Sequence, residues 1–254
     1  MDTIGLILIG LSFLLLFFMS ASTSTPLIDP APTGPATGSR QARFWDRIAR
    51  RYATEPIADM AGYEATLRRV QGLLAPGHEV LELGCGTGNT ALRLAPAAGR
   101  MLATDVSPAM IAIAQARQAA QPAPQLRFAV ASADAPVLPD GAFDRVLAFN
   151  LLHLVDRLDA TLAHVSRLLK PGGLLVSKTP CLAEMNPLIP HLMVPLMRAL
   201  GRAPRVASFG EADLRAAMER QGLRIEAVER QGTRGKDWRV FIVASKPLHP
   251  PGPG

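Results

Sequence analysis

Residues 80–94 read VLELGCGTGNTALRL, and this stretch decides the fold. An apolar run leads into Gly84, Gly86 and Gly88 at alternate positions, and a helical pattern follows them. Glycine has no Cβ, so it lets the backbone turn tightly and lets a ligand approach it closely. The helix after the glycines would present free N–H groups at its start. The stretch therefore predicts a buried strand, a ligand-binding loop and a helix.

The alternation of apolar runs and helical patterns continues along the chain. Helices are expected after Gly88, Ser107, Asp156 and Gly210. Alternating strands and helices favour an α/β fold with a parallel sheet covered on both faces. The last two strands are joined by a short link, QGTRGKDW, without a helix, so we expect them to pair antiparallel at the sheet edge. The predicted strands are 79–84, 100–106, 125–131, 143–149, 173–179, 224–230 and 239–246.

An uncharged apolar run, IGLILIGLSFLLLFFM at residues 4–19, precedes this pattern. Extended to residue 21 it has about 18 residues, or roughly 27 Å as a helix, enough to cross the hydrocarbon layer of a membrane. We predict an N-terminal membrane anchor at residues 1–21 and a flexible Ser/Thr/Pro/Ala/Gly-rich tether at 22–40. Arginines follow the anchor, which places the domain on the cytoplasmic face. A cleaved signal peptide is one alternative, and a later start codon, giving a cytoplasmic protein, is another.

The remaining chain, residues 41–248, is predicted as one domain with a short tail at 249–254. Residues 41–75 are expected to form two cap helices, whose Trp45 and Tyr52 either close over a ligand or pack on the sheet. Residues 180–205 follow the fifth strand and carry an apolar stripe with Met185 and Met193. The stripe is either core or the wall of a lipophilic pocket, and we predict a substrate lid here.

Composition excludes several classes of protein. Of the 254 residues, 48% are hydrophobic and 19% are charged, which indicates a globular protein. The net charge is +6, but much of it lies in residues 40–51, where five arginines accompany one acid, Asp46. Without an aromatic-interleaved basic patch, nucleic-acid binding is disfavoured. Two distant cysteines do not make a disulfide scaffold, and no metal-ligand spacing is present, so no metal is predicted.

The glycine spacing separates two classes of nucleotide-binding loop. Dinucleotide sites require G-x-G-x-x-G, whereas Gly84, Gly86 and Gly88 give G-x-G-x-G. Preceded by Glu82, the loop resembles the first motif of the class I S-adenosylmethionine-dependent methyltransferases. The resemblance implies a Rossmann-like, doubly wound, seven-stranded sheet that is mostly parallel with an antiparallel edge strand. It also implies S-adenosylmethionine as cofactor, resting on the loop, with Glu82 ordering the loop around its amino-acid portion.

Further segments resemble family motifs in the same order, over residues 44–247. Asp105, at the end of the second strand, resembles the acid that holds the ribose hydroxyls, although it could simply start a helix. Asp134 in ADAPVLPDGAFD resembles the acid that accepts a bond from adenine. FNLLHL after the fourth strand resembles a cavity wall, and LKPGG a turn before the fifth strand. The implied cofactor-binding residues are Glu82, Gly84, Cys85, Gly86, Thr87, Gly88, Asp105, Val106, Met110, Ala133, Asp134, Asn150 and Leu151.

Methyl transfer needs few protein groups, because the cofactor supplies the reactivity and the protein aligns the acceptor. His153 is the candidate general base, since its ordinary pKa is near neutral; alternatively it only packs or bonds a carbonyl. The motif order resembles quinone-biosynthesis and related small-molecule methyltransferases, which implies a small, lipophilic acceptor or lipid. The alternatives are a catalytically silent, membrane-tethered adenosylmethionine-binding module and a nicotinamide-dependent oxidoreductase. The oligomeric state is left open.

Overall fold

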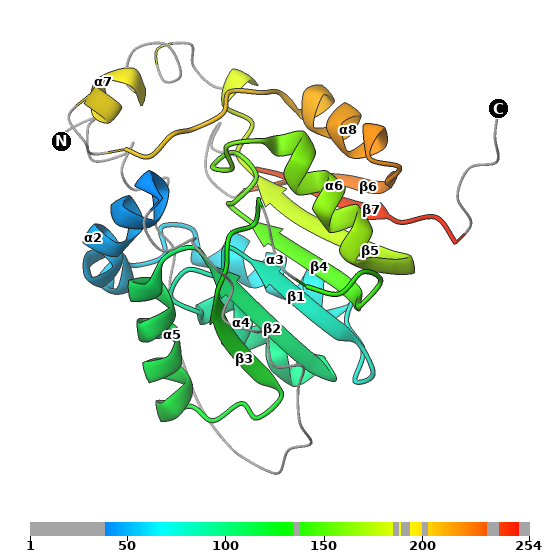
Figure 1. The fold of residues 1–254 in the computed structure, drawn as a ribbon, viewed down its shortest axis with the longest axis horizontal. Coiled ribbons are helices and arrows are strands. Elements are labelled where there is room, and N and C mark those ends of the chain that lie inside the picture. The colour runs from blue at the N-terminus through cyan, green and yellow to red at the C-terminus, as the bar shows by residue number, and fades with distance from the viewer. Residues whose placement is uncertain are drawn as a thin grey trace.

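Strands in the computed structural model form one sheet in the order β3-β2-β1-β4-β5-β7-β6 (Figure 1). The structure describes residues 39–134, 138–184, 188, 194–199, 203–232 and 239–248. The strands are β1 Glu79–Leu83, β2 Arg100–Asp105, β3 Leu126–Val130, β4 Phe143–Phe149, β5 Leu169–Thr179, β6 Arg224–Gln231 and β7 Arg239–Ser245. All seven lie where the sequence predicts them, except that β5 begins four residues early and includes the LKPGG segment that was expected to be a turn.

Strands β1 to β5 are parallel, and β7 is antiparallel to both β5 and β6. The predicted sheet, mostly parallel with antiparallel pairing at its edge, is confirmed. β7 lies second from the edge and β6 is outermost. The side chains explain this order: residues 240–245 of β7 are all buried, whereas β6 alternates exposed and partly buried positions. A continuously apolar strand is stable inside a sheet, and a charged one suits its edge.

Helices cover both faces of the sheet, because successive side chains of each strand point to opposite faces. Val80 packs with α3, α4 and α5, and its neighbour Leu81 packs with α6 and α8. In Figure 1, α6 and α8 lie in front of the strands and α3 and α4 behind them. The helices are α2 Arg40–Thr54, α3 Met60–Gln71, α4 Asn89–Leu94, α5 Pro108–Ala120, α6 Leu158–Leu168, α7 Val194–Ala199 and α8 Glu211–Arg220.

Several predictions fall on residues outside the described ranges. These are the anchor at 1–21, the tether up to residue 38, the tail beyond 248, and Met185 and Met193 of the apolar stripe. Within the ranges that are described, no helix is both long and apolar enough to span a membrane. The domain boundaries therefore stay predictions.

The glycines of the loop after β1 are needed for different reasons. Gly84, Gly86 and Gly88 all have positive φ, at 68°, 54° and 81°. A Cβ on Gly88 would lie 2.7 Å from both the Ala114 Cβ and the Phe128 ring, so this glycine allows α4 to pack between α5 and β3. A Cβ on Gly86 would meet only the Tyr52 ring, at 3.7 Å. Gly86 therefore faces open space on the side of the loop where a ligand would approach.

We predict that Gly88→Ala destabilises the protein more than Gly141→Ala does. Both residues have positive φ, which costs an alanine about 1–2 kcal/mol. A Cβ at Gly141 meets nothing within 4 Å, whereas one at Gly88 overlaps two core side chains and adds about 1–3 kcal/mol. Urea unfolding of the two variants measures the difference. Equal free energies of unfolding would contradict the packing role given to Gly88.

Candidate functional site

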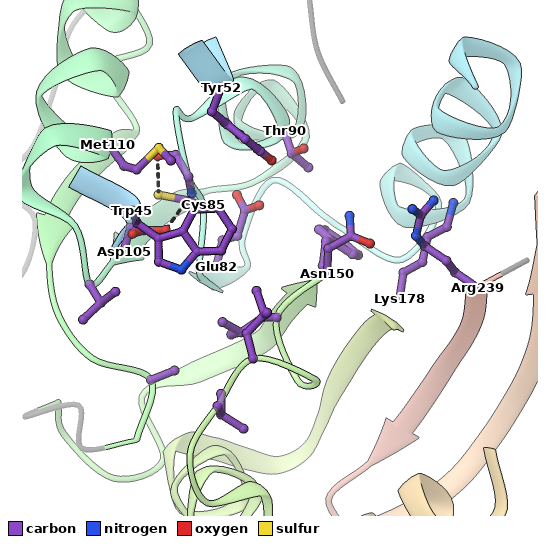
Figure 2. Close-up of a pocket in the computed structure, with 18 of the residues that line it drawn as sticks. Trp45, Tyr52, Glu82, Cys85, Thr90, Asp105, Met110, Asn150, Lys178 and Arg239 are labelled. Carbon is purple, nitrogen blue, oxygen red and sulfur yellow. Dashed lines mark hydrogen bonds between the residues drawn. The ribbon is translucent and has the colours of Figure 1, made fainter. Parts of the chain in front are cut away.

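A pocket opens at the carboxyl ends of the parallel strands, beside the junction of β1 and β4 (Figure 2). In sheets of this kind the strand order reverses at such a junction, and ligands bind there. Most of the predicted cofactor residues line the pocket, whereas Thr87 and Gly88 do not. Those that line it are Glu82, Gly84, Cys85, Gly86, Asp105, Val106, Met110, Ala133, Asp134, Asn150 and Leu151.

Asp105, the last residue of β2, ties the glycine loop to the start of α5. Its Oδ2 accepts a hydrogen bond from the Gly86 N–H, and its Oδ1 accepts one from the Ser107 N–H, both at 2.9 Å. Burial raises the pKa of Asp105 to about 6, although these two bonds favour the charged form. Ser107 caps α5 by accepting from the Met110 N–H at 3.1 Å. The acid at the end of the second strand thus fixes the loop and also faces the pocket.

Glu82, within β1, brings a second carboxyl group to the pocket. It is 2% exposed, and its Oε2 has no hydrogen-bond partner among the described residues. Burial, together with the charge of Asp105, raises its pKa to about 8. A buried acceptor without a partner is costly, so a cationic donor from a ligand would be stabilised here.

Helix α2 covers one side of the pocket, and Asp46 fastens it there. The Asp46 Oδ1 accepts from the Ser107 Oγ at 2.6 Å and from the Ala109 N–H at 3.0 Å, at the start of α5. A carboxylate is stabilised at a helix N-terminus, where free N–H groups meet. Trp45 and Tyr52 of α2 line the pocket, their rings 6.1 Å apart and nearly perpendicular. The helix therefore brings an aromatic wall to the ligand.

Arg117 of α5 holds the other end of α2. Its Nη2 donates to the Ala53 carbonyl at 2.9 Å, and its Nη1 donates to the Thr87 Oγ1 at 2.7 Å and to the Asn89 Oδ1 at 2.8 Å. One guanidinium therefore joins the end of α2, the glycine loop and the start of α4. Thr87 is buried, and it supports the glycine loop through Arg117 on the side away from the pocket.

Comparison with known proteins gives the family. A profile described as a methyltransferase domain matches residues 80–173. The chain is 31% identical over 186 residues to the demethylmenaquinone methyltransferase of Parafrankia sp. (strain EAN1pec), covering 66% of this chain and 73% of that one. It is 32% identical to EEF1A lysine methyltransferase 4 of Mus musculus, covering 63% and 68%. The chain belongs to the S-adenosylmethionine-dependent methyltransferase family.

The solved structures agree on the fold of this methyltransferase. Geranyl diphosphate C-methyltransferase from Streptomyces coelicolor A3(2), in complex with Mg²⁺, geranyl diphosphate and S-adenosyl-L-homocysteine, superposes with a TM-score of 0.63. It is 17% identical, and the match covers 85% of this chain and all of that one. The Rossmann-like fold implied by the glycine loop is thus confirmed, and membership of the family confirms the use of S-adenosylmethionine.

His153, the candidate general base of the methyltransferase, does not line the pocket. It is 2% exposed, and burial together with the charge of Arg239 lowers its pKa to about 3. Its backbone carbonyl accepts from the Ala207 N–H at 2.8 Å. A neutral, buried imidazole outside the pocket does not favour a catalytic role, and the packing alternative fits this geometry better.

A polar end of the pocket was not predicted from the sequence. Lys178, near the end of β5, and Arg239, the first residue of β7, line it together with Thr66 and Gln231. Figure 2 shows Lys178 and Arg239 side by side, away from Glu82 and Asp105. Lys178, near the end of the apolar run GLLVSKT, was a usable signal, because the carboxyl ends of the parallel strands meet at this edge of the sheet. Arg239 offered none until the position of β7 was known.

We predict that Asp46→Asn loosens α2 from the methyltransferase. The variant weakens two bonds to a charged acceptor, and a loss of about 1.5 kcal/mol makes local opening about tenfold more frequent. Limited trypsin digestion reads this out, because α2 contains Arg43, Arg47 and Arg50 and must open to be cut. Glu55→Gln is the control, because Glu55 caps the C-terminal end of the same helix and pairs with the exposed Arg51 instead of with α5. Equal cleavage rates in both variants would contradict the docking role of Asp46.

Proposed function

We propose that the glycine loop, Glu82 and Asp105 hold S-adenosylmethionine. The observation that carries the assignment is the Glu82 Oε2 atom, which is buried, lacks a partner among the described residues and belongs to a pocket-lining residue. The ammonium of the cofactor's amino-acid portion would supply the missing donor. Gly84 and Gly86, whose backbones line the pocket beside it, would lie against that portion.

Asp105 is suited to the ribose. Each of its oxygens already accepts one backbone N–H, and a carboxylate oxygen can accept a second bond. Two such charge-assisted bonds to neighbouring hydroxyls orient the sugar. Asp134 is suited to the adenine amino group, with its Oδ1 fixed by the Thr161 hydroxyl at 2.7 Å.

S-adenosylmethionine, when bound, supplies an electrophilic methyl group. The chain's own residues then have to align the acceptor and exclude water. Trp45 and Tyr52 on α2 close one side of the pocket. Burial raises the pKa of Tyr52 to about 12, so its hydroxyl stays neutral and can act as a hydrogen-bond donor. The arrangement therefore favours positioning and exclusion of water over proton transfer by His153.

The acceptor we propose is a small, lipophilic molecule. The enzymes that act on demethylmenaquinone and geranyl diphosphate both carry names of lipophilic substrates, whereas the mouse relative is named for a protein lysine. The walls of the pocket favour the first class, because an apolar surface binds an apolar ligand. The apolar side chains that line it are Leu67, Val70, Phe149, Leu151, Leu154 and Val155.

We predict that the protein transfers a labelled methyl group from S-adenosylmethionine to a lipophilic acceptor. A panel of prenylated hydroquinones, aromatic acids and lysine peptides, each tested with the purified chain, would identify the class. Leu67→Asn, which places an amide in the apolar wall, should raise KM for a lipophilic acceptor about tenfold or more. Transfer to lysine peptides alone would overturn the lipophilic assignment. Cofactor binding without transfer to any acceptor would favour a catalytically silent module.

We also propose that α2 meets an anionic membrane surface. Its arginines at 40, 43, 47, 50 and 51 are all exposed, whereas Ala42 and Ala49 on the same helix are buried. Each basic residue near an anionic surface contributes about 1 kcal/mol. The same helix covers the pocket, so a lipid-soluble acceptor would have a short path from membrane to site. The anchor predicted at residues 1–21 would hold the domain close enough for this contact.

Vesicle sedimentation of the full chain tests the membrane proposal. We predict that replacing Arg43, Arg47 and Arg50 by Gln weakens binding to anionic vesicles and leaves binding to neutral vesicles unchanged. Replacing Arg215, Arg220 and Arg224, which are exposed elsewhere, removes the same charge and should have little effect. High salt should abolish the difference, because exposed charges are screened. Equal losses in both triple variants would refute a specific role for α2.

A further inference from the structure

Two cations meet at the end of the pocket remote from the acidic residues. Lys178 and Arg239 belong to the neighbouring antiparallel strands β5 and β7, which pair Lys178 with Phe241 and Thr179 with Val240. This register brings the start of β7 beside the end of β5, and both side chains line the pocket. In Figure 2 they lie beyond Asn150 as seen from Glu82 and Asp105. The pocket therefore has an acidic end and a basic end.

Hydrogen bonds position the ammonium group of Lys178. Its Nζ donates to the Thr66 Oγ1 at 2.7 Å, and this hydroxyl lies 2.9 Å from the Gln231 Oε1. Thr66 itself is held in α3 by a bond to the Gly62 carbonyl at 2.7 Å. An ammonium has three N–H donors, so the bond to Thr66 fixes Lys178 and leaves it able to bind a further acceptor.

The charges at this end have a positive balance. The one carboxylate among the pocket-lining residues near it is Asp59, which caps α3 by accepting from the Gly62 N–H at 3.0 Å. Burial and the charge of Arg239 together lower the pKa of Lys178 to about 8, while the charge of Asp59 acts in the opposite sense. A bound anion would reduce the repulsion between Lys178 and Arg239. Glu82 and Asp105 lie at the other end.

We propose that Lys178 and Arg239 form a subsite for an anionic group of the acceptor, either a carboxylate or a phosphate. The inference rests on the proposed function, because it requires the cofactor to occupy the acidic end. With the cofactor there, the basic end and the apolar wall between them face the acceptor. An amphiphile fits these three parts: a reactive atom near the methyl group, an apolar body along Leu151 and Phe149, and an acid at Lys178.

The alternative occupant of the two cations is the carboxylate of the cofactor itself. The acidic end argues against it, because Glu82 binds the ammonium in our proposal and Asn150 stands between Glu82 and Lys178 in Figure 2. The two assignments differ in a measurable way. If the cations bind the cofactor, their loss weakens cofactor binding; if they bind the acceptor, it does not.

Calorimetry on the full chain saturated with S-adenosylhomocysteine tests the subsite with two probes, octanoate and inorganic phosphate. We expect Lys178→Met and Arg239→Met each to weaken binding of the preferred probe about tenfold or more, since each loses a charge-assisted bond. Lys178→Arg keeps the charge and should keep the binding. Arg220→Met, which removes an exposed cation paired with Asp159, is the matched control. Preference for octanoate identifies a carboxylate acceptor, and preference for phosphate a phosphorylated one.

Three results would overturn the subsite. The first is that neither probe binds the wild-type chain, and the second is that the probes bind all variants equally. The third is that Lys178→Met and Arg239→Met lose affinity for S-adenosylhomocysteine by the same factor as for the probe. The last result would assign the cations to the cofactor. Failure of the proposed function is separate from these, because it would appear as absence of S-adenosylhomocysteine binding in the wild-type chain.

Discussion

The site depends on the two hydrogen bonds that the Asp105 carboxylate accepts from the Gly86 and Ser107 N–H groups. It joins the end of β2 to the loop after β1 and to the start of α5, so one carboxylate fixes three segments. The Ser107 hydroxyl in turn donates a hydrogen bond to Asp46, which belongs to α2. The loop, the first turn of α5 and the covering helix thus form one hydrogen-bonded unit. A ligand that binds Asp105 would act on the whole unit.

This unit is built around two buried carboxyl groups, and burial sets their chemistry. It raises the pKa of Glu82 to about 8 and that of Asp105 to about 6, so burial disfavours the charged form of both groups and acts most strongly on Glu82. A cationic ligand reverses the balance by pairing with Glu82. In the proposed binding mode, the ammonium of S-adenosylmethionine supplies this cation and the ribose hydroxyls bind Asp105. Because water does not solvate these buried carboxylates, pairing with a cationic ligand stabilises them more than it would at the surface.

The strands, the glycine loop and the acids at strand ends could be predicted, because each depends on local sequence: apolar period, glycine spacing and position within a strand. Asp46 and Arg117 could not be assigned, because their hydrogen-bond partners lie far away in the chain, and Arg239 could not be assigned before the position of β7 was known. The burial of His153 could not be predicted either. Asn150 adopts φ 51°, and in the turn it begins His153 is buried away from the pocket. Asparagine adopts the left-handed conformation more readily than most residues, so Asn150 marked a turn but did not show which side chains that turn would bury.

The protonation of Glu82 tests most directly whether Glu82 pairs with the cofactor. Free Glu82 is largely protonated at pH 7, since its pKa is about 8, and pairing with an ammonium requires the carboxylate. Calorimetry of S-adenosylhomocysteine binding in buffers of different ionisation enthalpy measures the linked protons. We predict that the wild-type chain releases a proton that Glu82→Gln does not release, and that wild-type affinity rises relative to the variant up to about pH 8. Equal proton release by both, at equal affinity, would contradict the account.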